Sequence, residues 1–258
     1  TNLVGTINCL NFALKNSAKF IFLSTSRVYP INKLTEINYA ETETRFEILE
    51  KQIVPGVSTS GINENFSLNG ARSFYGASKL ASELLIQEYA EFYKLRTVIN
   101  RCGVITGPWQ MGKIDQGVVV LWLARHYWKK ELSYIGFGGQ GKQVRDILHI
   151  DDLYDLVKIQ LTDIDKYKND IYNAGGGQQI SVSLQELTAL CEEVTGNRIS
   201  IKNVAENRTA DIPVYITDNS KISSLSGWNP LKTTKDILQD IFEWIRLNEK
   251  SVGNFLNQ

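Results

Sequence analysis

The feature that most constrains the fold is a pair of short apolar segments separated by one long helical pattern. Residues 20–24 (FIFLS) and 97–101 (TVINR) have the length and character of strands buried on both faces. Between them, residues 74–94 repeat apolar side chains at helical spacing. A strand, a helix and a further strand in succession favour parallel pairing, with helices covering the sheet. The chain is therefore predicted to have an α/β fold.

The rest of the chain mixes shorter patterns. Apolar residues at helical spacing open the chain, in a helix that ends at Lys19. Residues 31–73 are polar with weak periodicity, which predicts a long irregular insertion over the surface, and loops of this length are often functional. Beyond Pro108, helices are predicted over residues 116–129, 151–162 (with Asp151 as the N-cap), 183–195 and 234–248. Extended segments are predicted over residues 132–135, 143–150, 171–173 and 199–204.

Composition excludes several classes of protein. The 28 Lys and Arg residues balance 28 Asp and Glu, so net charge gives no bulk attraction to nucleic acid or to an anionic membrane. Ten Phe, eleven Tyr and five Trp supply apolar surface that disordered chains lack. The longest apolar run, residues 118–124, is too short to cross a bilayer. Cys9, Cys102 and Cys191 suit neither a disulfide framework nor a metal quartet, so we expect a soluble, cytoplasmic protein without a metal site.

One glycine-rich segment matches a nucleotide-binding motif by letters alone. Gly136–Gly141 (GFGGQG) fits the G-x-G-x-x-G pattern. A dinucleotide loop of this kind needs a helix directly after it, whose amide groups face the pyrophosphate. Residues 142–149 instead alternate as in a strand. A hairpin turn is therefore predicted here, and not the cofactor site.

A second motif carries chemistry. Tyr75 and Lys79 are four residues apart in the predicted helix, so both side chains project from one face. An ammonium beside a phenol stabilises the phenolate, which makes a general base for a hydroxyl proton. A surface pair without function is the alternative. Thr25 and Ser26 favour the catalytic interpretation, because they end the preceding strand, and α/β sheets bind ligands at the carboxyl ends of their strands.

Several segments, taken together, resemble one family. They are Tyr75 with Lys79, residues 2–8 (NLVGTIN), 22–29 (FLSTSRVY), 145–152 (RDILHIDD), 208–211 (RTAD), 218–221 (DNSK) and 225–228 (LSGW). Taken in their order along the chain, they resemble the extended short-chain dehydrogenase/reductase family, the NAD-dependent nucleotide-sugar epimerases and dehydratases. Residues 98–113 (VINRCGVITGPWQMGK) and the long insertion are similar to the branch of CDP-paratose 2-epimerase, also called CDP-tyvelose epimerase.

The resemblance implies roles for residues on the cofactor side. Tyr75 matches the catalytic base, and Lys79 its partner, which also holds the nicotinamide ribose of NAD. Thr25 matches the residue that hydrogen-bonds the reacting sugar hydroxyl, with Ser24 as the less favoured candidate. Residues 101–103 (Arg101, Cys102 and Gly103) match the segment that passes the nicotinamide and the sugar.

The resemblance also implies roles on the substrate side. Arg145 and Arg208 match positions that grip the diphosphate of a nucleotide sugar, a task that suits a bidentate guanidinium. A simple ion pair of Arg145 with Asp146 or Asp151 is the alternative. Ser26 and Thr25 lie where the sugar is expected.

Two departures from the family pattern matter. In the dehydratases an Asp-Glu pair follows the catalytic Thr and supplies acid and base, whereas this chain has Ser26 and Arg27, which disfavours dehydration. The family's glycine-rich G-x-x-G-x-x-G loop is also absent, and its place is before the helix that opens this chain. We therefore expect a missing N-terminal portion of about 80–100 residues, at about thirty residues per βαβ unit. A processed start is the alternative.

The fold prediction is then a partial Rossmann-type parallel sheet with a smaller mixed α/β substrate domain. Residues 1–108 are expected to form the C-terminal half of the NAD-binding domain, and residues 109–258 mainly the substrate domain, with some segments returning to the sheet. A homodimer through the helix of Tyr75 is plausible, although Leu80, Leu84 and Tyr89 suit an internal core equally well.

Three functions remain open at this point. The first is an NAD-dependent epimerase of a nucleotide-diphosphate sugar, at carbon 2 or, as the runner-up, carbon 4. The second is a keto-sugar reductase of the same family, which consumes reduced cofactor. The third is a binding or scaffold protein without catalysis.

Overall fold

The computed structural model describes residues 1–112 and 117–257. Its helices are α1 (Asn2–Lys15), α2 (Ile31–Leu34), α3 (Phe74–Tyr93), α4 (Val118–Tyr127), α5 (Ile150–Thr162), α6 (Ile164–Tyr167), α7 (Leu184–Thr195), α8 (Ser220–Ser226), α9 (Thr234–Leu247) and α10 (Glu249–Leu256). Its strands are β1 (Phe20–Thr25), β2 (Tyr39–Glu41), β3 (Phe46–Ile48), β4 (Val57–Ser58), β5 (Gly61–Ile62), β6 (Thr97–Cys102), β7 (Val104–Thr106), β8 (Leu132–Ile135), β9 (Val144–His149), β10 (Asp170–Ala174), β11 (Ser181–Ser183), β12 (Ile201–Val204) and β13 (Val214–Tyr215). A short 3₁₀ turn, Ser26–Val28, follows β1.

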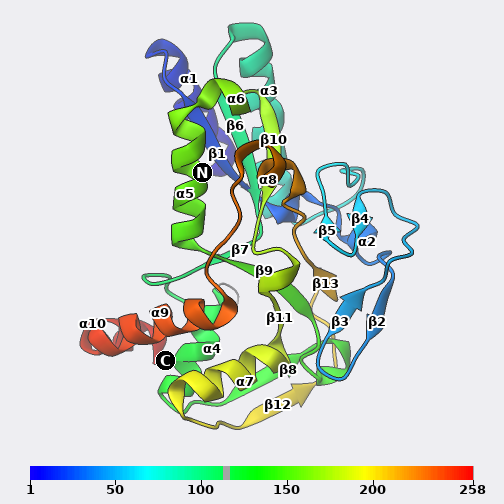
Figure 1. The fold of residues 1–258 in the computed structure, drawn as a ribbon, viewed down its shortest axis with the longest axis vertical. Helices are drawn as coiled ribbons and strands as arrows, with labels where there is room; N and C mark the ends of the chain where they lie inside the picture. The colour runs from blue at the N-terminus through cyan, green and yellow to red at the C-terminus, as the bar shows by residue number, and fades with distance from the viewer. Residues whose placement is uncertain (113–116, 258) are drawn as a thin grey trace.

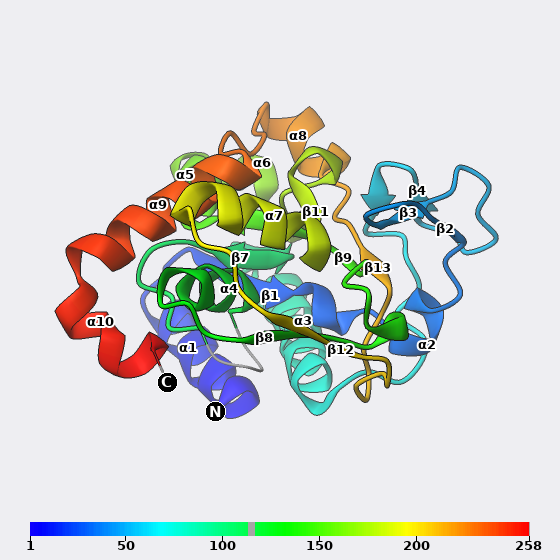
Figure 2. The ribbon, with the colours of Figure 1, turned by 90° about the horizontal axis from the view of Figure 1, so that it is seen from below.

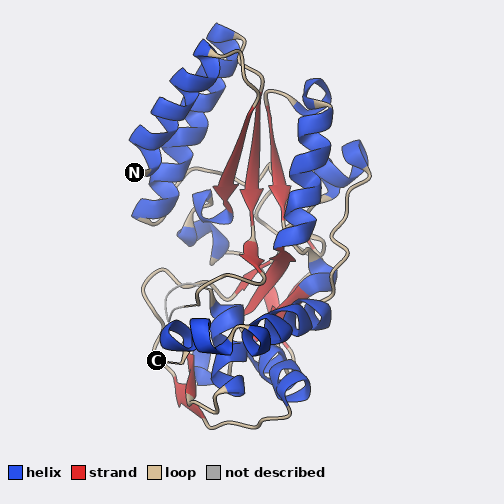
Figure 3. Ribbon diagram, turned by 90° about the vertical axis from the view of Figure 1, so that its left-hand side faces the viewer, coloured by secondary structure: helices blue, strands red, loops and turns tan. Residues whose placement is uncertain are grey.

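A three-stranded parallel sheet in the order β1-β6-β10 forms one half of the molecule. Helices cover both of its faces, as Figure 3 shows, with the three strands in the centre. On one face α1 and α3 pack through Leu10, Ile86 and Ile99. On the other face α5 and α6 contribute Leu156 and Ile164 to a second cluster. The predicted α/β fold with a parallel sheet is confirmed.

The other half of the molecule is built around β9. This strand pairs with β7 and β13 in parallel and with β11 antiparallel, while β8 and β12 form a separate parallel pair. Helices α4, α7 and α9 pack together beside these strands, and α10 closes the chain (Figure 1). Seen from below in Figure 2, β8 and β12 run side by side across the middle of the view.

The insertion 31–73 shares a buried core with residues outside it, whereas we expected an irregular surface excursion. It folds into α2 and two small hairpins, β2-β3 and β4-β5 (Figure 1). Phe66 and Ile62 are 2% and 0% exposed and belong to a cluster that also contains residues of β13. Backbone bonds between Ile62 and the 216–218 segment fasten the insertion to the second half. The insertion is therefore an ordered part of the fold, held by contacts between residues that are far apart in the sequence.

Several local predictions were wrong. The first helix ends at Lys15, and Ser17 then adopts a positive φ of 52°. The N-cap of α5 is His149, whose side chain accepts from the amide of Asp151, so Asp151 lies in the first turn. Gly136–Gly141 is not a hairpin turn, because β8 pairs with β12 and β9 with other strands.

Some elements were not predicted, and one predicted helix boundary lies outside the described residues. Strand β7 and helix α10 were missed by the sequence patterns. The predicted helix start at Gln116 falls outside the described residues, as does Lys113. Among the described helices, none has the length and apolar character to cross a membrane.

Candidate active site

The first turn of α3 lies directly against the turn that follows β1. Ser73 caps this helix by accepting from the amide of Gly76 at 3.1 Å. A Cβ on Gly76 would come within 2.0 Å of the carbonyl oxygen of Arg27. This close approach allows only glycine, and it brings the turn of α3 that contains Tyr75 beside the carboxyl end of β1. Tyr75 itself is 50% exposed.

The side chain of Lys79, on α3, contacts the strand β1. Its Nζ donates to the carbonyl oxygen of Leu23 at 2.5 Å and stands 4.0 Å from the centre of the Phe22 ring. Partial burial lowers the pKa of Lys79 below its ordinary value. Thr25 ends the strand, is 8% exposed, and accepts from the amide of Arg27. The Thr25 hydroxyl and the Lys79 ammonium thus both lie at β1, and Tyr75 is one helical turn before Lys79 on α3.

Beneath them lies a buried ion pair that the sequence patterns did not predict. Arg101 of β6 pairs with Glu83 of α3 at 2.7 Å, and the two side chains are 3% and 0% exposed. The hydroxyl of Ser24 donates to the same carboxylate at 2.5 Å. Glu83 follows Lys79 by four residues, so the helical spacing of Tyr75 and Lys79 continues to this carboxylate. The side chains of Ser24 and Arg101 therefore both contact Glu83 in the interior of the protein.

The next two residues of the predicted cofactor segment are buried in different ways. Cys102 is 2% exposed, and burial raises the pKa of its thiol to about 12. Gly103 donates its amide to the carbonyl oxygen of Ala174 at 2.9 Å. A Cβ there would meet the Thr217 hydroxyl oxygen at 3.0 Å, so close packing favours glycine.

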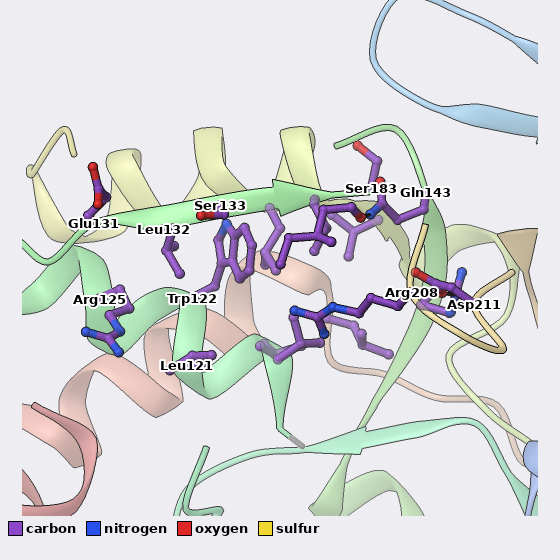
Figure 4. A pocket seen from close by; sticks show the side chains of 18 residues that line it. Leu121, Trp122, Arg125, Glu131, Leu132, Ser133, Gln143, Ser183, Arg208 and Asp211 are labelled. Atoms are coloured by element: carbon purple, nitrogen blue, oxygen red, sulfur yellow. Dashed lines mark hydrogen bonds and ion pairs between the residues drawn. The ribbon is translucent and has the colours of Figure 1, made fainter. Parts of the chain in front are cut away.

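A cavity of about 330 Å³ opens between α4, β8, β9 and α7. Most of its wall is apolar, with Arg125 at one end and Leu121, Trp122 and Leu132 toward that end (Figure 4). Arg208 enters from the opposite end and extends along the cavity, as the close-up shows. No ion pair or hydrogen bond of the described residues engages the Arg208 guanidinium.

Arg145 lines this cavity and also a second, smaller one of about 50 Å³. Its guanidinium donates to the carboxylate of Asp211 at 3.0 Å and to the carbonyl oxygen of Ile212 at 2.7 Å. Burial, partly offset by Asp211, lowers the pKa of Arg145 to about 10. The alternative partners considered from the sequence, Asp146 and Asp151, do not pair with it. The sequence did contain a hint of this partner, since Asp211 is the last residue of the 208–211 motif.

The smaller cavity lies next to the turn after β1. Its polar lining residues include Ser26, Arg27, Tyr29 and Ser73, the N-cap of α3. No Asp or Glu is among its described lining residues. Arg145 therefore lines both cavities: the large, mostly apolar one and the small one, whose wall includes Ser26, the residue after Thr25.

Comparison with known proteins identifies the family. The NAD dependent epimerase/dehydratase family matches residues 1–175. The chain belongs to this family. Its sequence is 31% identical over 247 residues to CDP-paratose 2-epimerase of Salmonella typhi, covering 94% of this chain and 70% of that protein. It is 25% identical to a probable UDP-glucuronate 4-epimerase of Rhizobium meliloti, covering 96% and 68%.

A solved structure shows the same fold. UDP-N-acetylglucosamine 4-epimerase of Methanobrevibacter ruminantium superposes with a TM-score of 0.73 at 19% identity, covering 96% of this chain and 69% of that one. At this identity the likeness supports the fold alone. Family membership and fold agree with an enzyme of the NAD-dependent sugar-nucleotide epimerase family.

Proposed function

We propose that this protein is an NAD-dependent epimerase of a nucleotide-diphosphate sugar. The observation that carries the proposal is that Arg145 lines both cavities. A nucleoside in the large cavity and a diphosphate at Arg145 direct the attached sugar toward the small cavity, which is lined by Ser26, the residue after Thr25, and by Ser73, the N-cap of α3.

Two arginines suit the diphosphate. Arg145 is held in place by Asp211, and its position between the cavities is where the phosphates of such a substrate would lie. Arg208 extends along the large cavity without a protein partner among the described residues. A guanidinium binds phosphate oxygens through two parallel hydrogen bonds, which fixes orientation as well as adding affinity.

The side chains at the carboxyl end of β1 suit proton transfer. The phenolate of Tyr75 takes the proton of the sugar hydroxyl, and the Thr25 hydroxyl holds that oxygen in position. The Lys79 ammonium favours the phenolate by its charge. Bound NAD supplies hydride acceptance and return, so that the inverted carbon ends at its original oxidation state. Tyr75 gives the proton back when the sugar carbonyl is reduced.

These residues fit the nicotinamide half of the cofactor. Lys79 presents an ammonium at β1, and Tyr75 precedes it by one helical turn on α3. An ammonium and a phenol are donors that ribose hydroxyls accept. Ser24 and Arg101 are turned to Glu83, so contacts of these segments with NAD would fall to the backbone near Gly103. We further propose that residues 1–108 supply the nicotinamide side of the cofactor domain and residues 109–258 mainly the substrate domain, supported by the return of β10 to the sheet.

The small cavity favours epimerisation over dehydration. Ser26 and Arg27 line it, and none of its described lining residues is a carboxylic acid that could protonate a leaving hydroxyl. Because the relative of Salmonella typhi is a CDP-paratose 2-epimerase, we propose a CDP-sugar as substrate and carbon 2 as the inverted centre.

A homodimer and a cytoplasmic location complete the proposal. Phe12 of α1 and Phe92 of α3 are 68% and 73% exposed on neighbouring helices, which favours pairing of two copies there. The three cysteines are free, as in a reducing compartment.

The test is an epimerisation assay with a CDP-sugar and NAD. We expect the carbon-2 epimer to form without net accumulation of NADH. Tyr75→Phe removes the proton acceptor and is expected to lower kcat by about 10²–10⁴-fold. Tyr93→Phe, on the same helix and 60% exposed, is the matched control and is expected to leave kcat unchanged. Stoichiometric consumption of NADH would identify a reductase instead, and full turnover by Tyr75→Phe would refute the assigned base.

A further inference from the structure

A chain of buried hydrogen bonds joins α3, which contains Tyr75, to the insertion 31–73. At the helix end of this chain, Arg101 donates to the Glu83 carboxylate through Nε at 3.2 and 3.1 Å and through Nη2 at 2.7 Å. Its other terminal nitrogen, Nη1, donates to the hydroxyl oxygen of Tyr29 at 3.4 Å, and the guanidinium carbon is 5.2 Å from the centre of the Tyr29 ring. A buried ion pair is stable only when its remaining hydrogen-bonding groups also have partners. Tyr29 is such a partner for this pair.

The Tyr29 hydroxyl continues the chain on its other side. It donates to Oδ1 of Asn173 on β10 at 2.7 Å, and Tyr29 and Asn173 are 1% and 0% exposed. Burial raises the pKa of Tyr29, so this hydroxyl keeps its proton and remains a donor. The insertion holds Asn173 in turn, since Nδ2 of Asn173 donates to the carbonyl oxygen of Ile62 at 2.9 Å and its backbone amide to the Glu64 carboxylate at 2.6 Å. The chain therefore extends from the insertion through β10, Tyr29 and β6 to α3.

The position of Glu83 on α3 gives this chain control over the rotation of the helix. Gly76 packs against the carbonyl oxygen of Arg27, and Glu83 follows Gly76 by seven residues. Residues seven apart lie on one face of a helix, here about 10.5 Å apart along its axis. Two contacts on one face fix how far the helix is turned and where it lies against the sheet. The direction of the Tyr75 phenol, next to Gly76 in the sequence, depends on both contacts.

Tyr29 also belongs to the side of the site where the sugar is expected. It follows the 3₁₀ turn after Thr25 and lines the small cavity. Its ring packs edge to face against Phe66 of the insertion, with 5.4 Å between the ring centres. Its hydroxyl already has two partners, Arg101 and Asn173, and is thus engaged within the protein. Tyr29 therefore connects the wall of the small cavity to the network that holds α3.

We propose that Tyr29 is a positioning residue, which ties the Arg101–Glu83 pair to the insertion and so directs Tyr75 toward the substrate sugar. This inference rests on the proposed function, in which Tyr75 is the base. It goes beyond that function by giving a part in catalysis to a residue, and to an insertion, that transfer no proton. A buried network whose members are all paired selects one arrangement of the elements that it joins. Loss of the Tyr29 hydroxyl leaves its neighbours with an unpaired group, and the arrangement relaxes.

The experiment measures kcat, KM and amide hydrogen exchange in the variant Tyr29→Phe, which keeps the packed ring and removes the hydroxyl. In the epimerisation assay we expect kcat to fall by about 10-fold, because a small misplacement of a catalytic group is costly, with KM within about twofold. The pH profile of kcat should keep its shape, since Tyr75 and Lys79 move together on α3. In the protein without ligand, the amides of α3 around Glu83 should exchange about threefold faster or more.

Tyr172→Phe is the matched control. Tyr172 is also 1% exposed and precedes Asn173 on β10, but its hydroxyl donates to the carbonyl oxygen of Tyr167 at 3.3 Å, within the cluster on the other face of the sheet. Its loss should lower the urea midpoint about as much as Tyr29→Phe does, with kcat and the exchange of α3 unchanged. A second variant, Asn173→Ala, removes the acceptor and keeps Tyr29, and it is expected to reproduce the fall in kcat.

The outcomes separate this inference from the proposed function. Full kcat in a folded Tyr29→Phe variant overturns the inference, as does an equal fall of kcat in Tyr172→Phe. A rise in KM at unchanged kcat also overturns it, because Tyr29 would then be a ligand of the substrate. Absence of epimerase turnover in the unaltered protein contradicts the proposed function, and hydrogen exchange then decides the role of Tyr29 separately. Faster exchange of α3 in Tyr29→Phe alone supports its hold on the helix, and unchanged exchange contradicts it.

Discussion

The large cavity, where we propose that the nucleotide binds, and the carboxyl end of β1, where we propose proton transfer (the catalytic edge), are built in different ways. Around the cavity, Arg145 is paired, its side chain is 20% exposed, and helices and strands from four parts of the chain form the wall. At the catalytic edge, Phe74 and Tyr75 are 98% and 50% exposed. Within the described residues, β1 pairs with β6 alone. The proposed substrate recognition and the proposed proton transfer therefore involve separate groups of contacts, and each can be altered while the other is measured.

The largest expected effect comes from the buried pair under the catalytic edge. Glu83→Gln removes the charge partner of Arg101 and leaves a buried guanidinium uncompensated, which should cost about 3 kcal/mol of unfolding free energy. Urea denaturation measures this loss. Glu243→Gln breaks an exposed pair with Arg246 and should change stability by less than about 0.5 kcal/mol. Equal losses of unfolding free energy in the two variants would contradict the larger contribution that we expect from the buried pair.

Arg145→Met tests the other region. It removes the proposed phosphate ligand and leaves Asp211 unpaired, so CDP affinity should fall by about 100-fold in calorimetry. Arg125→Met, at the opposite end of the cavity, is the control and should change CDP affinity by less than about threefold. A loss of CDP affinity at Arg125 that matched the loss at Arg145 would place the phosphates at the wrong end.

Gly76→Ala asks whether the two regions are separable. The new Cβ meets the carbonyl oxygen of Arg27, so the first turn of α3 must move away from the end of β1. We expect kcat to fall by about 10–100-fold, because small misplacement of catalytic groups is costly, with CDP affinity within about twofold. Gly5→Ala, in α1 with open space around it, should leave kcat unchanged and stabilise the chain slightly. A parallel loss of CDP binding in Gly76→Ala would show that the regions are coupled.

The smallest expected effect is on the pH dependence of catalysis. Burial lowers the pKa of Lys79, so its ammonium is lost at lower pH than that of a free lysine, near 10.4. The kcat profile should therefore fall on the alkaline side below that value, as the charge beside Tyr75 disappears. Lys79→Arg keeps the charge at all accessible pH and should remove this alkaline fall. An unchanged profile would assign the fall to another group.

The sequence predicted the parts of the fold that depend on local patterns. The apolar segments became β1 and β6, and the pattern between them became α3, because burial on both faces leaves an uninterrupted apolar run. Pairing over long separations was not predictable in the same way. The glycine-rich segment at 136–141 was assigned to a hairpin, yet β9 pairs with strands 30 to 70 residues further along the chain.

The site shows the same division. The spacing of Tyr75 and Lys79 predicted their common face, but Glu83, one helical turn on, was overlooked because its partner Arg101 is on another element. The ion pair of Arg145 with Asp211 spans 66 residues, so nearer carboxylates were considered first. Contacts of this kind arise only when the chain has folded.

The central claim is that one carbon of a nucleotide sugar is oxidised and reduced again in place, beside Tyr75. The most direct test follows a CDP-sugar that has deuterium at carbon 2, incubated with the protein and NAD in ordinary water. The account predicts that the epimeric product keeps the deuterium, with no net NADH. Loss of the deuterium to solvent would show that the carbon exchanges a proton with water, and would contradict the account.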